Sequence, residues 1–395
     1  MKKSFSGFYN PTNAETKLAW QSNNTVFIFD TNIFLNLYSY KEETRNDFFR
    51  FLSKLKEKIW MPFHVGLEYQ MKRLDIIKEA KKVFRDANKS LDDIKELEKS
   101  LKVIVDRFPS LSSETEELLK NINNLIDNYR NSLNELDKNQ PCVRSHDEIR
   151  EQLNKLFDGR IGKEPDQEFI NNVEKEGEER YKNKLPPGFE DDKKKGEFFY
   201  GNVKYQNKFG DLIIWKQIIE YIKENHEINN VIFVTDDSKD DWWFNIESNG
   251  KKKIGPHAFL IDEIKRINNV QLFDMYSTSY FLQLASKYYP EEKPISEDSI
   301  NDVESTNIFN YSSKFEDASK EEDFFESSEP NNQRTEINII QKAKNKSLLE
   351  MIITELIKAG LADQKRKRLN ASSNFEKFYI VDKDISNDEK KDDNE

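Results

Sequence analysis

Carboxylate side chains stand at places in this sequence where a buried strand ends or a helix begins. These residues are Asp30, Glu68, Asp211, Asp236 and Asp237. Each one alone has an ordinary explanation, because Asp is a preferred helix N-cap and acids in a first turn complement the helix dipole. Together they indicate one cluster, because the carboxyl ends of parallel strands face the functional crevice of an open α/β sheet.

Clustered carboxylates restrict the chemistry that the site can perform. Carboxylates repel one another unless they are protonated or neutralised by cations. Mg²⁺ and Mn²⁺ prefer oxygen ligands, keep several waters and suit a site made of a few carboxylates and a phosphate. Two such ions about 4 Å apart activate a water and stabilise the leaving oxygen of a phosphodiester. The sequence shows no Ser/His/Asp or Cys/His arrangement, so it favours hydrolysis with Mg²⁺ or Mn²⁺.

The elements that must position these acids are short buried strands that alternate with helices. Residues 26–29 and 231–234 form continuous β-branched or aromatic runs, and each run is followed by acids. Such runs are typical of strands buried on both faces of a parallel sheet. Residues 59–61 and 270–273 are weaker strand candidates. The pattern predicts an α/β domain with a central parallel sheet.

A long, charged helical segment interrupts this domain between about residues 70 and 185. Apolar residues recur at heptad-like spacing from Ile77 to Phe108, and a second stripe runs from Leu119 to Leu136. Pro109 and the serines that follow it separate the two stripes. The segment is predicted to be an antiparallel, coiled-coil-like helical hairpin. It is a candidate substrate clamp, dimerisation arm or docking surface for a protein partner.

The last hundred residues differ in composition from the rest. Residues 291–336 contain 14 acidic and four basic side chains, and this composition is typical of a disordered acidic linker. Apolar residues from Ile340 to Ile357 then recur at helical spacing and predict an amphipathic C-terminal helix. The expected division is an α/β domain at 1–69 and 186–290, a helical hairpin insertion at 70–185, an acidic linker at 291–336, and a C-terminal helix with an acidic tail at 337–395.

Composition excludes several classes of protein. The net charge of −11 argues against a polycation that coats nucleic acid or membrane, although a local basic surface is allowed. The single cysteine, Cys142, excludes a disulfide framework and a cysteine-based zinc site. No apolar run approaches the roughly 18 residues of a membrane span, and no secretory signal is evident. A cytoplasmic protein without membrane contacts is expected.

The acidic motifs resemble those of PIN-domain nucleases. The resemblance lies in FIFDTN at 27–32, the helix carrying Glu68, FGDLIIWK at 209–216 and VIFVTDD at 231–237. In addition, DDWW at 240–243 and IGP at 254–256 resemble the bacterial PIN-like subfamily that carries a long helical insertion. The resemblance spans roughly residues 27–284. It implies a three-layer α/β/α sandwich and metal-dependent cleavage of RNA or, less often, DNA.

The resemblance also assigns roles to residues. It makes Asp30 the central metal ligand, with Glu68 and Asp211 completing the cluster. The fourth acid is either Asp236 or Asp237, since family members differ at this point. A fifth acid, in an outer position, and three polar side chains that orient the carboxylates complete the expected site. These residues are Asp241, Thr31, Asn32 and Thr235.

Three functions are compatible with the sequence. The first is a Mg²⁺- or Mn²⁺-dependent nuclease acting on RNA or single-stranded DNA, with RNA favoured. The sequence does not decide between a toxin, a phage-defence effector and a housekeeping nuclease, and the resemblance favours the first two. The second is an inactive PIN-like scaffold that binds RNA or a protein partner, or associates with itself, through residues 70–185 and the C-terminal helix. The third is a phosphotransfer domain with Asp30 as nucleophile, which is disfavoured because Asn32 stands where such enzymes carry a second acid.

Overall fold

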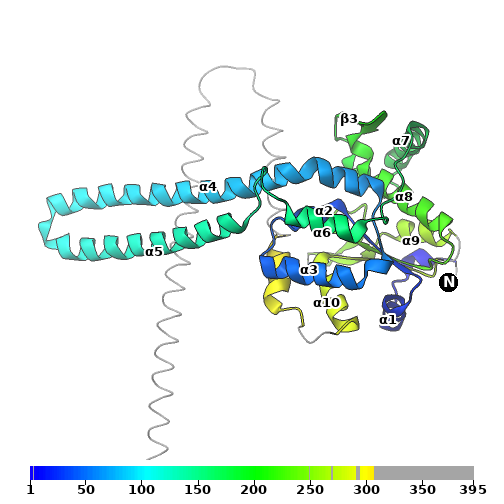
Figure 1. Ribbon diagram of the computed structural model, residues 1–395, viewed down its shortest axis with the longest axis horizontal. Helices are drawn as coiled ribbons and strands as arrows, with labels where there is room; N and C mark the ends of the chain where they lie inside the picture. Colours follow the sequence, from blue (N-terminus) through cyan, green and yellow to red (C-terminus); the bar gives the residue numbers. More distant parts are fainter. Residues whose placement is uncertain (3, 249, 268–269, 291–293, 307–395) are drawn as a thin grey trace, which may run out of the picture. The chain divides into compact units, whose positions relative to one another are not determined.

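The computed structural model describes residues 1–2, 4–248, 250–267, 270–290 and 294–306 (Figure 1). The expected C-terminal helix, the acidic tail and most of the acidic linker lie outside the described residues. The helices are α1 (Asn13–Gln21), α2 (Thr31–Asn36), α3 (Glu42–Lys54), α4 (Phe63–Arg107), α5 (Ser112–Asn139), α6 (Glu148–Phe157), α7 (Gln167–Lys182), α8 (Gly210–Glu224), α9 (Ala258–Lys265) and α10 (Thr278–Tyr288).

The four predicted strands form one parallel sheet. These strands are β1 (Thr25–Phe29), β2 (Ile59–Trp60), β5 (Asn230–Val234) and β8 (Leu272–Tyr276), in the spatial order β2-β1-β5-β8. All residues of β1 and β5 are buried, as their continuous apolar sequences predicted. In the central pair, Phe29 stands opposite Val234, so the acids that follow these residues emerge side by side. Strand β8 begins two residues later than predicted and continues to the buried Tyr276.

Helices cover both faces of the sheet and create the predicted three-layer α/β/α architecture (Figure 1). On one face, Phe27 contacts Trp20 of α1 and Phe281 of α10, with ring centroids 4.8 and 6.1 Å apart. On the other face, Phe273 packs edge-on against Trp215 of α8 at 5.5 Å. Large aromatic side chains thus fill both interfaces between sheet and helices, where burial contributes most to stability.

The predicted helical hairpin consists of α4 and α5, which lie side by side and antiparallel (Figure 1). Helix α4 is continuous over 45 residues, and its first part belongs to the core of the α/β domain through Val65 and Ile77. Farther along, Leu91 packs against Ile126 and Leu133 of α5 in a separate small cluster. The hairpin therefore begins inside the domain, and its distal part has an apolar cluster of its own.

Two later helices of the segment 70–185 belong to the main core rather than to the hairpin. Helices α6 and α7 contribute Leu153, Phe157, Ile170 and Val173 to the same buried cluster as the sheet. Asp147 caps α6 by accepting a hydrogen bond from the backbone N–H of Arg150 at 3.0 Å. The α/β domain thus includes the first part of α4 and the helices α6 and α7, which lie at the two ends of the segment 70–185.

Two further features were not expected from the sequence. Residues 297–306, which fall in the segment expected to be a disordered linker, are helical, and their Val303 is fully buried in the main core. Ser299 also donates a hydrogen bond to the buried Asp47 at 3.0 Å. Two antiparallel hairpins lie outside the central sheet, namely β3 (Glu197–Tyr200) with β4 (Val203–Gln206), and β6 (Trp243–Glu247) with β7 (Lys251–Pro256). None of the described helices has the length and apolar character to cross a membrane.

Candidate active site

Asp30 stands at the carboxyl end of β1 and is the N-cap of α2. Its carboxylate accepts hydrogen bonds from the backbone N–H of Thr31 at 2.7 Å, the hydroxyl of Thr235 at 2.7 Å and the amide of Asn32 at 2.5 Å. Thr235 follows β5, the neighbouring strand, so two strand ends together fix this side chain. The predicted orienting role of Asn32 and Thr235 corresponds to these contacts.

Glu68 lies on α4 and faces the start of α2. One of its carboxylate oxygens accepts a hydrogen bond from the hydroxyl of Thr31 at 2.8 Å, and the other is 3.0 Å from the ammonium of Lys72 one turn later. The N-terminus of α8 lies against the same side chain, because a Cβ added to Gly210 would meet the Oε1 atom of Glu68 at 3.4 Å. Glu68 therefore belongs to the same edge of the sheet as Asp30.

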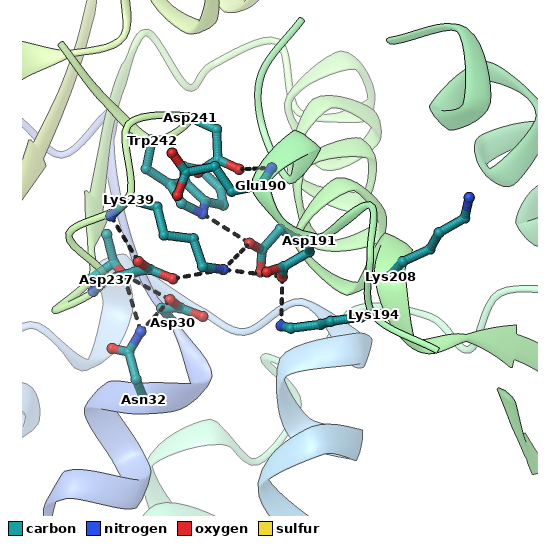
Figure 2. Close-up of polar contacts among 12 residues, drawn as sticks. Asp30, Asn32, Glu190, Asp191, Lys194, Lys208, Asp237, Lys239, Asp241 and Trp242 are labelled. Atoms are coloured by element: carbon teal, nitrogen blue, oxygen red, sulfur yellow. Dashed lines mark hydrogen bonds and ion pairs between the residues drawn. The ribbon is translucent and has the colours of Figure 1, made fainter. Parts of the chain in front are cut away.

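Asp211 lies in the first turn of α8 and contacts a lysine that connects several carboxylates. The Nζ atom of Lys239 is 3.2 Å from Asp211 and 3.1 Å from Asp237. It is also 3.0 Å from Asp191, which pairs in addition with Lys194 at 2.6 Å. Figure 2 shows the Lys239 side chain extending between Asp237 and Asp191. One ammonium group thus joins three carboxylates from three separate chain segments.

The two adjacent acids after β5 point to different surroundings. Asp236 accepts hydrogen bonds from the backbone N–H and the hydroxyl of Thr278, at 2.8 and 2.6 Å, and so holds the start of α10. Asn36 also donates to Asp236, at 3.2 Å. Asp237 instead faces Lys239 and contributes to the electrostatic environment of Asp30. Of the two sequence candidates, Asp237 is therefore the one brought into the acidic cluster.

Asp241 is fully buried beside the cluster. One of its oxygens accepts a hydrogen bond from the backbone N–H of Glu190 at 3.1 Å, and the other oxygen, Oδ1, has no hydrogen-bond partner in the described part of the chain (Figure 2). Burial and the nearby Asp211 raise the pKa of Asp241 to about 7. A buried carboxylate oxygen without a partner is costly, which marks a place where a proton or a cation is favoured.

The pKa of Asp30 reflects its burial and the carboxylates close to it. Burial, followed by the negative charges of Asp211, Asp237 and Glu68, raises the pKa of Asp30 to about 7, against the opposing effect of the Thr235 hydrogen bond. Burial also acts against the charged form of Asp211, but Lys239 lowers the pKa of that carboxyl below its usual value. Lys239 therefore compensates the charge of Asp211, whereas no ion pair in the described part of the chain compensates Asp30 itself.

The side chains present fit Mg²⁺ or Mn²⁺ by donor chemistry. The acids offer oxygen atoms only, which these ions prefer, and Oδ1 of Asp241 lacks a partner. Within the described ranges, no three acidic, histidine or cysteine side chains are already arranged around one ion position. The contacts of Lys239 explain why no such ion position is open, because its ammonium group lies where three of the carboxylates converge.

Asp191 and Lys239 belong to the site but were not identified from the sequence. Asp191 ends a short 3-10 helix (Phe189–Asp191) in an irregular connection, so no strand or long helix marks its position. That connection approaches the site through Gly188, which has a φ of 89° and where an added Cβ would lie 3.3 Å from the Cβ of Asp211. In the sequence, Lys239 could have been noticed as the single basic residue between Asp237 and Asp240.

Comparison with known proteins was consistent with this architecture. A family model described as a PIN like domain matches residues 26–259, which is more than half of the chain. The match begins in β1, includes the helical hairpin and covers every acid of the site described above. No curated protein and no solved structure gives a significant match. The chain belongs to the PIN-like domain family.

Proposed function

We propose that this protein is a nuclease that depends on Mg²⁺ or Mn²⁺ and hydrolyses phosphodiester bonds in RNA or single-stranded DNA. The PIN-like domain is a nuclease-type fold. The observation that carries the proposal is the meeting of Asp30, Glu68, Asp211 and Asp237 at one edge of the sheet. Thr31 donates hydrogen bonds to both Asp30 and Glu68, and Lys239 contacts both Asp211 and Asp237. The absence of an apolar membrane segment from the sequence supports a cytoplasmic location.

The proposed roles follow from the surroundings of each acid. The metal would be held by four carboxylates, those of Asp30, Glu68, Asp211 and Asp237. Asp241 would take an outer position beside them. A bound Mg²⁺ or Mn²⁺ supplies positive charge that favours attack of water on a phosphodiester and offsets the charge of the leaving oxygen. The hydrogen bonds from Thr235 and Asn32 keep the Asp30 carboxylate in one orientation. Such fixed orientation lowers the reorganisation that catalysis requires.

End-labelled oligonucleotides provide the direct test. Single-stranded and duplex RNA and DNA are incubated with the protein in Mg²⁺, Mn²⁺ or EDTA, and Asp30→Asn prepared in parallel controls for contaminating nucleases. We expect cleavage in a divalent metal and none in EDTA. Cleavage should survive a 2′-deoxy substitution at the scissile nucleotide, because the proposed nucleophile is water. Cleavage that persists in EDTA or requires the 2′-hydroxyl would contradict the proposal, and no cleavage by a protein that binds Mn²⁺ would favour a scaffold.

A second role, self-association through the hairpin, is favoured by one face of α5. Leu118, Leu125, Tyr129 and Leu136 are between 48% and 60% exposed and follow one another at spacings of seven, four and seven residues. Such spacing is typical of a helix face that packs on another helix, and exposed apolar stripes mark interaction surfaces. We propose that this stripe meets the same stripe of a second copy.

Substitution of Leu125 by Asp tests this role by sedimentation. We expect the wild-type protein to sediment as a dimer and Leu125→Asp as a folded monomer, because the substitution would place a charge in an exposed stripe of α5. Ile126→Asp is the contrasting variant, since Ile126 is buried against α4. It should loosen the hairpin itself, seen as faster amide exchange in α5. Equal masses for wild-type protein and Leu125→Asp would remove the self-association proposal.

A further inference from the structure

Lys239 lies inside the acidic cluster rather than at its rim. We propose that its ammonium group occupies one of the cation positions of the cluster, so that the protein binds a single divalent ion, on the Asp30 side. This inference rests on the proposed metal-dependent function and specifies it.

The ammonium group of Lys239 donates hydrogen bonds to Asp191 and Asp211 and forms an ion pair with Asp237. An ammonium group has three protons to donate and no acceptor. The Nζ atom lies within 3.0 to 3.2 Å of one oxygen each of Asp191, Asp211 and Asp237. These acids come from the short helix before β3, the first turn of α8 and the loop after β5. Figure 2 shows Asp191 and Asp237 on either side of the end of the lysine side chain. The arrangement is that of a coordinated ion, in which the cation is covalently tied to the chain.

The remaining acids are held in a different way. Asp30 accepts hydrogen bonds from neutral donors, the backbone of Thr31 and the side chains of Asn32 and Thr235. Glu68 is bound by the hydroxyl of Thr31 and by Lys72, whose side chain is 56% exposed. The cluster is thus divided into a half that already contains a partly buried monovalent cation, Lys239, and a half in which the charge of Asp30 itself is not compensated. A divalent ion should therefore bind most favourably in the half that contains Asp30.

This division has an electrostatic consequence for metal binding. An ammonium group carries one positive charge, whereas a divalent ion carries two, so the lysine lowers the repulsion among Asp191, Asp211 and Asp237 without neutralising them completely. A second divalent ion would have to displace Lys239 from all three contacts, and an ammonium group that stays partly buried without these partners is costly. Removing the lysine charge should therefore open the second position to a metal ion.

Metal binding by Lys239→Met tests this inference without any measurement of cleavage. Calorimetric titration with Mn²⁺ should give one site in the wild-type protein, and either two sites or at least about tenfold tighter binding in the variant. Electron paramagnetic resonance should show an isolated Mn²⁺ signal in the wild-type protein and a coupled pair in the variant, because two ions in one such site lie about 4 Å apart. Mn²⁺ should also raise the melting temperature of the variant more than that of the wild type.

Three further variants complete the experiment. Lys216→Met is the matched control, because Lys216 is also partly buried between two carboxylates, Glu176 at 2.7 Å and Glu263 at 3.1 Å, away from the cluster. It should bind Mn²⁺ as the wild type does. Lys239→Arg keeps the charge and should retain one site. Lys239→Gln removes the charge but keeps polar contacts, and it replaces the methionine variant if that protein does not fold.

The possible outcomes separate this inference from the proposed function. Wild-type binding of two ions, or an unchanged number of sites and unchanged affinity in both Lys239→Met and Lys239→Gln, would overturn the role of Lys239 and leave the metal-dependent function standing. Absence of Mn²⁺ binding from the wild-type protein and from every variant would overturn the proposed function, and the inference with it. One site in the wild type and a gain only in the uncharged variants would establish Lys239 as the resident cation.

Discussion

Asp30→Asn is expected to lower metal-dependent cleavage at least about 10³-fold, because Asp30 is the proposed central metal ligand and the charge of such a ligand is worth several kcal/mol in the transition state. The same substitution is expected to stabilise the metal-free protein. Asn has nearly the size of Asp and keeps one oxygen to accept hydrogen bonds from Thr235 or Asn32, while it removes a buried charge from beside Asp211 and Asp237. Activity and stability should thus change in opposite directions.

The stabilising effect of Asp30→Asn on the metal-free protein should depend on pH. Burial and neighbouring carboxylates raise the pKa of Asp30 from 3.8 to about 7, so the folded protein holds a proton there that the unfolded chain has already released. The favourable contribution is complete below about pH 4 and is lost as the pH rises through about 7. In the asparagine variant this loss is absent. The variant should therefore melt above the wild type at pH 8 in EDTA, and the difference should shrink toward pH 5.

Thermal melting in EDTA from pH 5 to pH 8, with a parallel cleavage assay in Mn²⁺, checks both parts. The magnitude of the stabilisation at pH 8 is on the order of 1–3 kcal/mol, after allowance for the hydrogen bonds that asparagine cannot accept. Saturating Mn²⁺ should reverse the order of the melting temperatures, since the wild type binds the ion and the variant does not. A variant that melts below the wild type at every pH, or that cleaves normally, would contradict the assignment of Asp30.

Asp237→Asn and Asp236→Asn are expected to have different effects although the two residues are adjacent. Asp237 shares Lys239 with Asp211 in the acidic cluster, so its substitution should reduce cleavage about 10²-fold or more and weaken Mn²⁺ binding. Asp236 holds the start of α10 through Thr278. Its substitution should cost on the order of 1–2 kcal/mol of unfolding free energy, as for the loss of a helix cap, while metal affinity is retained.

Each of these two variants is the control for the other. Calorimetric titration with Mn²⁺ and chemical denaturation of both proteins separate the two effects, because one variant should change only the first measurement and the other only the second. The reverse outcome, with metal binding lost in Asp236→Asn and retained in Asp237→Asn, would move the ligand role to Asp236 and require the α10 contact to break when a metal ion binds.

The sequence was most informative where an element has a strong periodic signature. The four strands and the hairpin followed from apolar patterns. The convergence of Asp30, Glu68 and Asp211 followed from acids at strand ends and at helix starts, since parallel strands bring their carboxyl ends together at one edge of the sheet. The hairpins β3–β4 and β6–β7 carry no comparable signature, because they lie outside the buried sheet. Their strands are short and partly exposed, so turn chemistry and local contacts decide their position more than hydrophobic pattern does.

The elements that the sequence did not indicate owe their position to tertiary contacts. Residues 297–306 are acidic and polar in composition, yet the burial of Val303 and the hydrogen bond from Ser299 to Asp47 hold them on the α/β domain. Lys239 joins the acids only because three distant chain segments meet around it. The choice between Asp236 and Asp237 likewise depended on where α10 begins, which no local pattern near residue 236 reveals.

Helix α4 carries Glu68 near its beginning and the hairpin along the remainder, and no break separates the two over its 45 residues. At about 1.5 Å per residue, an uninterrupted helix of this length is a lever of roughly 65 Å. A force on the far end of the hairpin therefore acts on the same continuous helix that carries Glu68. In mechanical terms, a molecule that binds the distal hairpin is connected, through one uninterrupted helix, to a carboxylate of the acidic cluster.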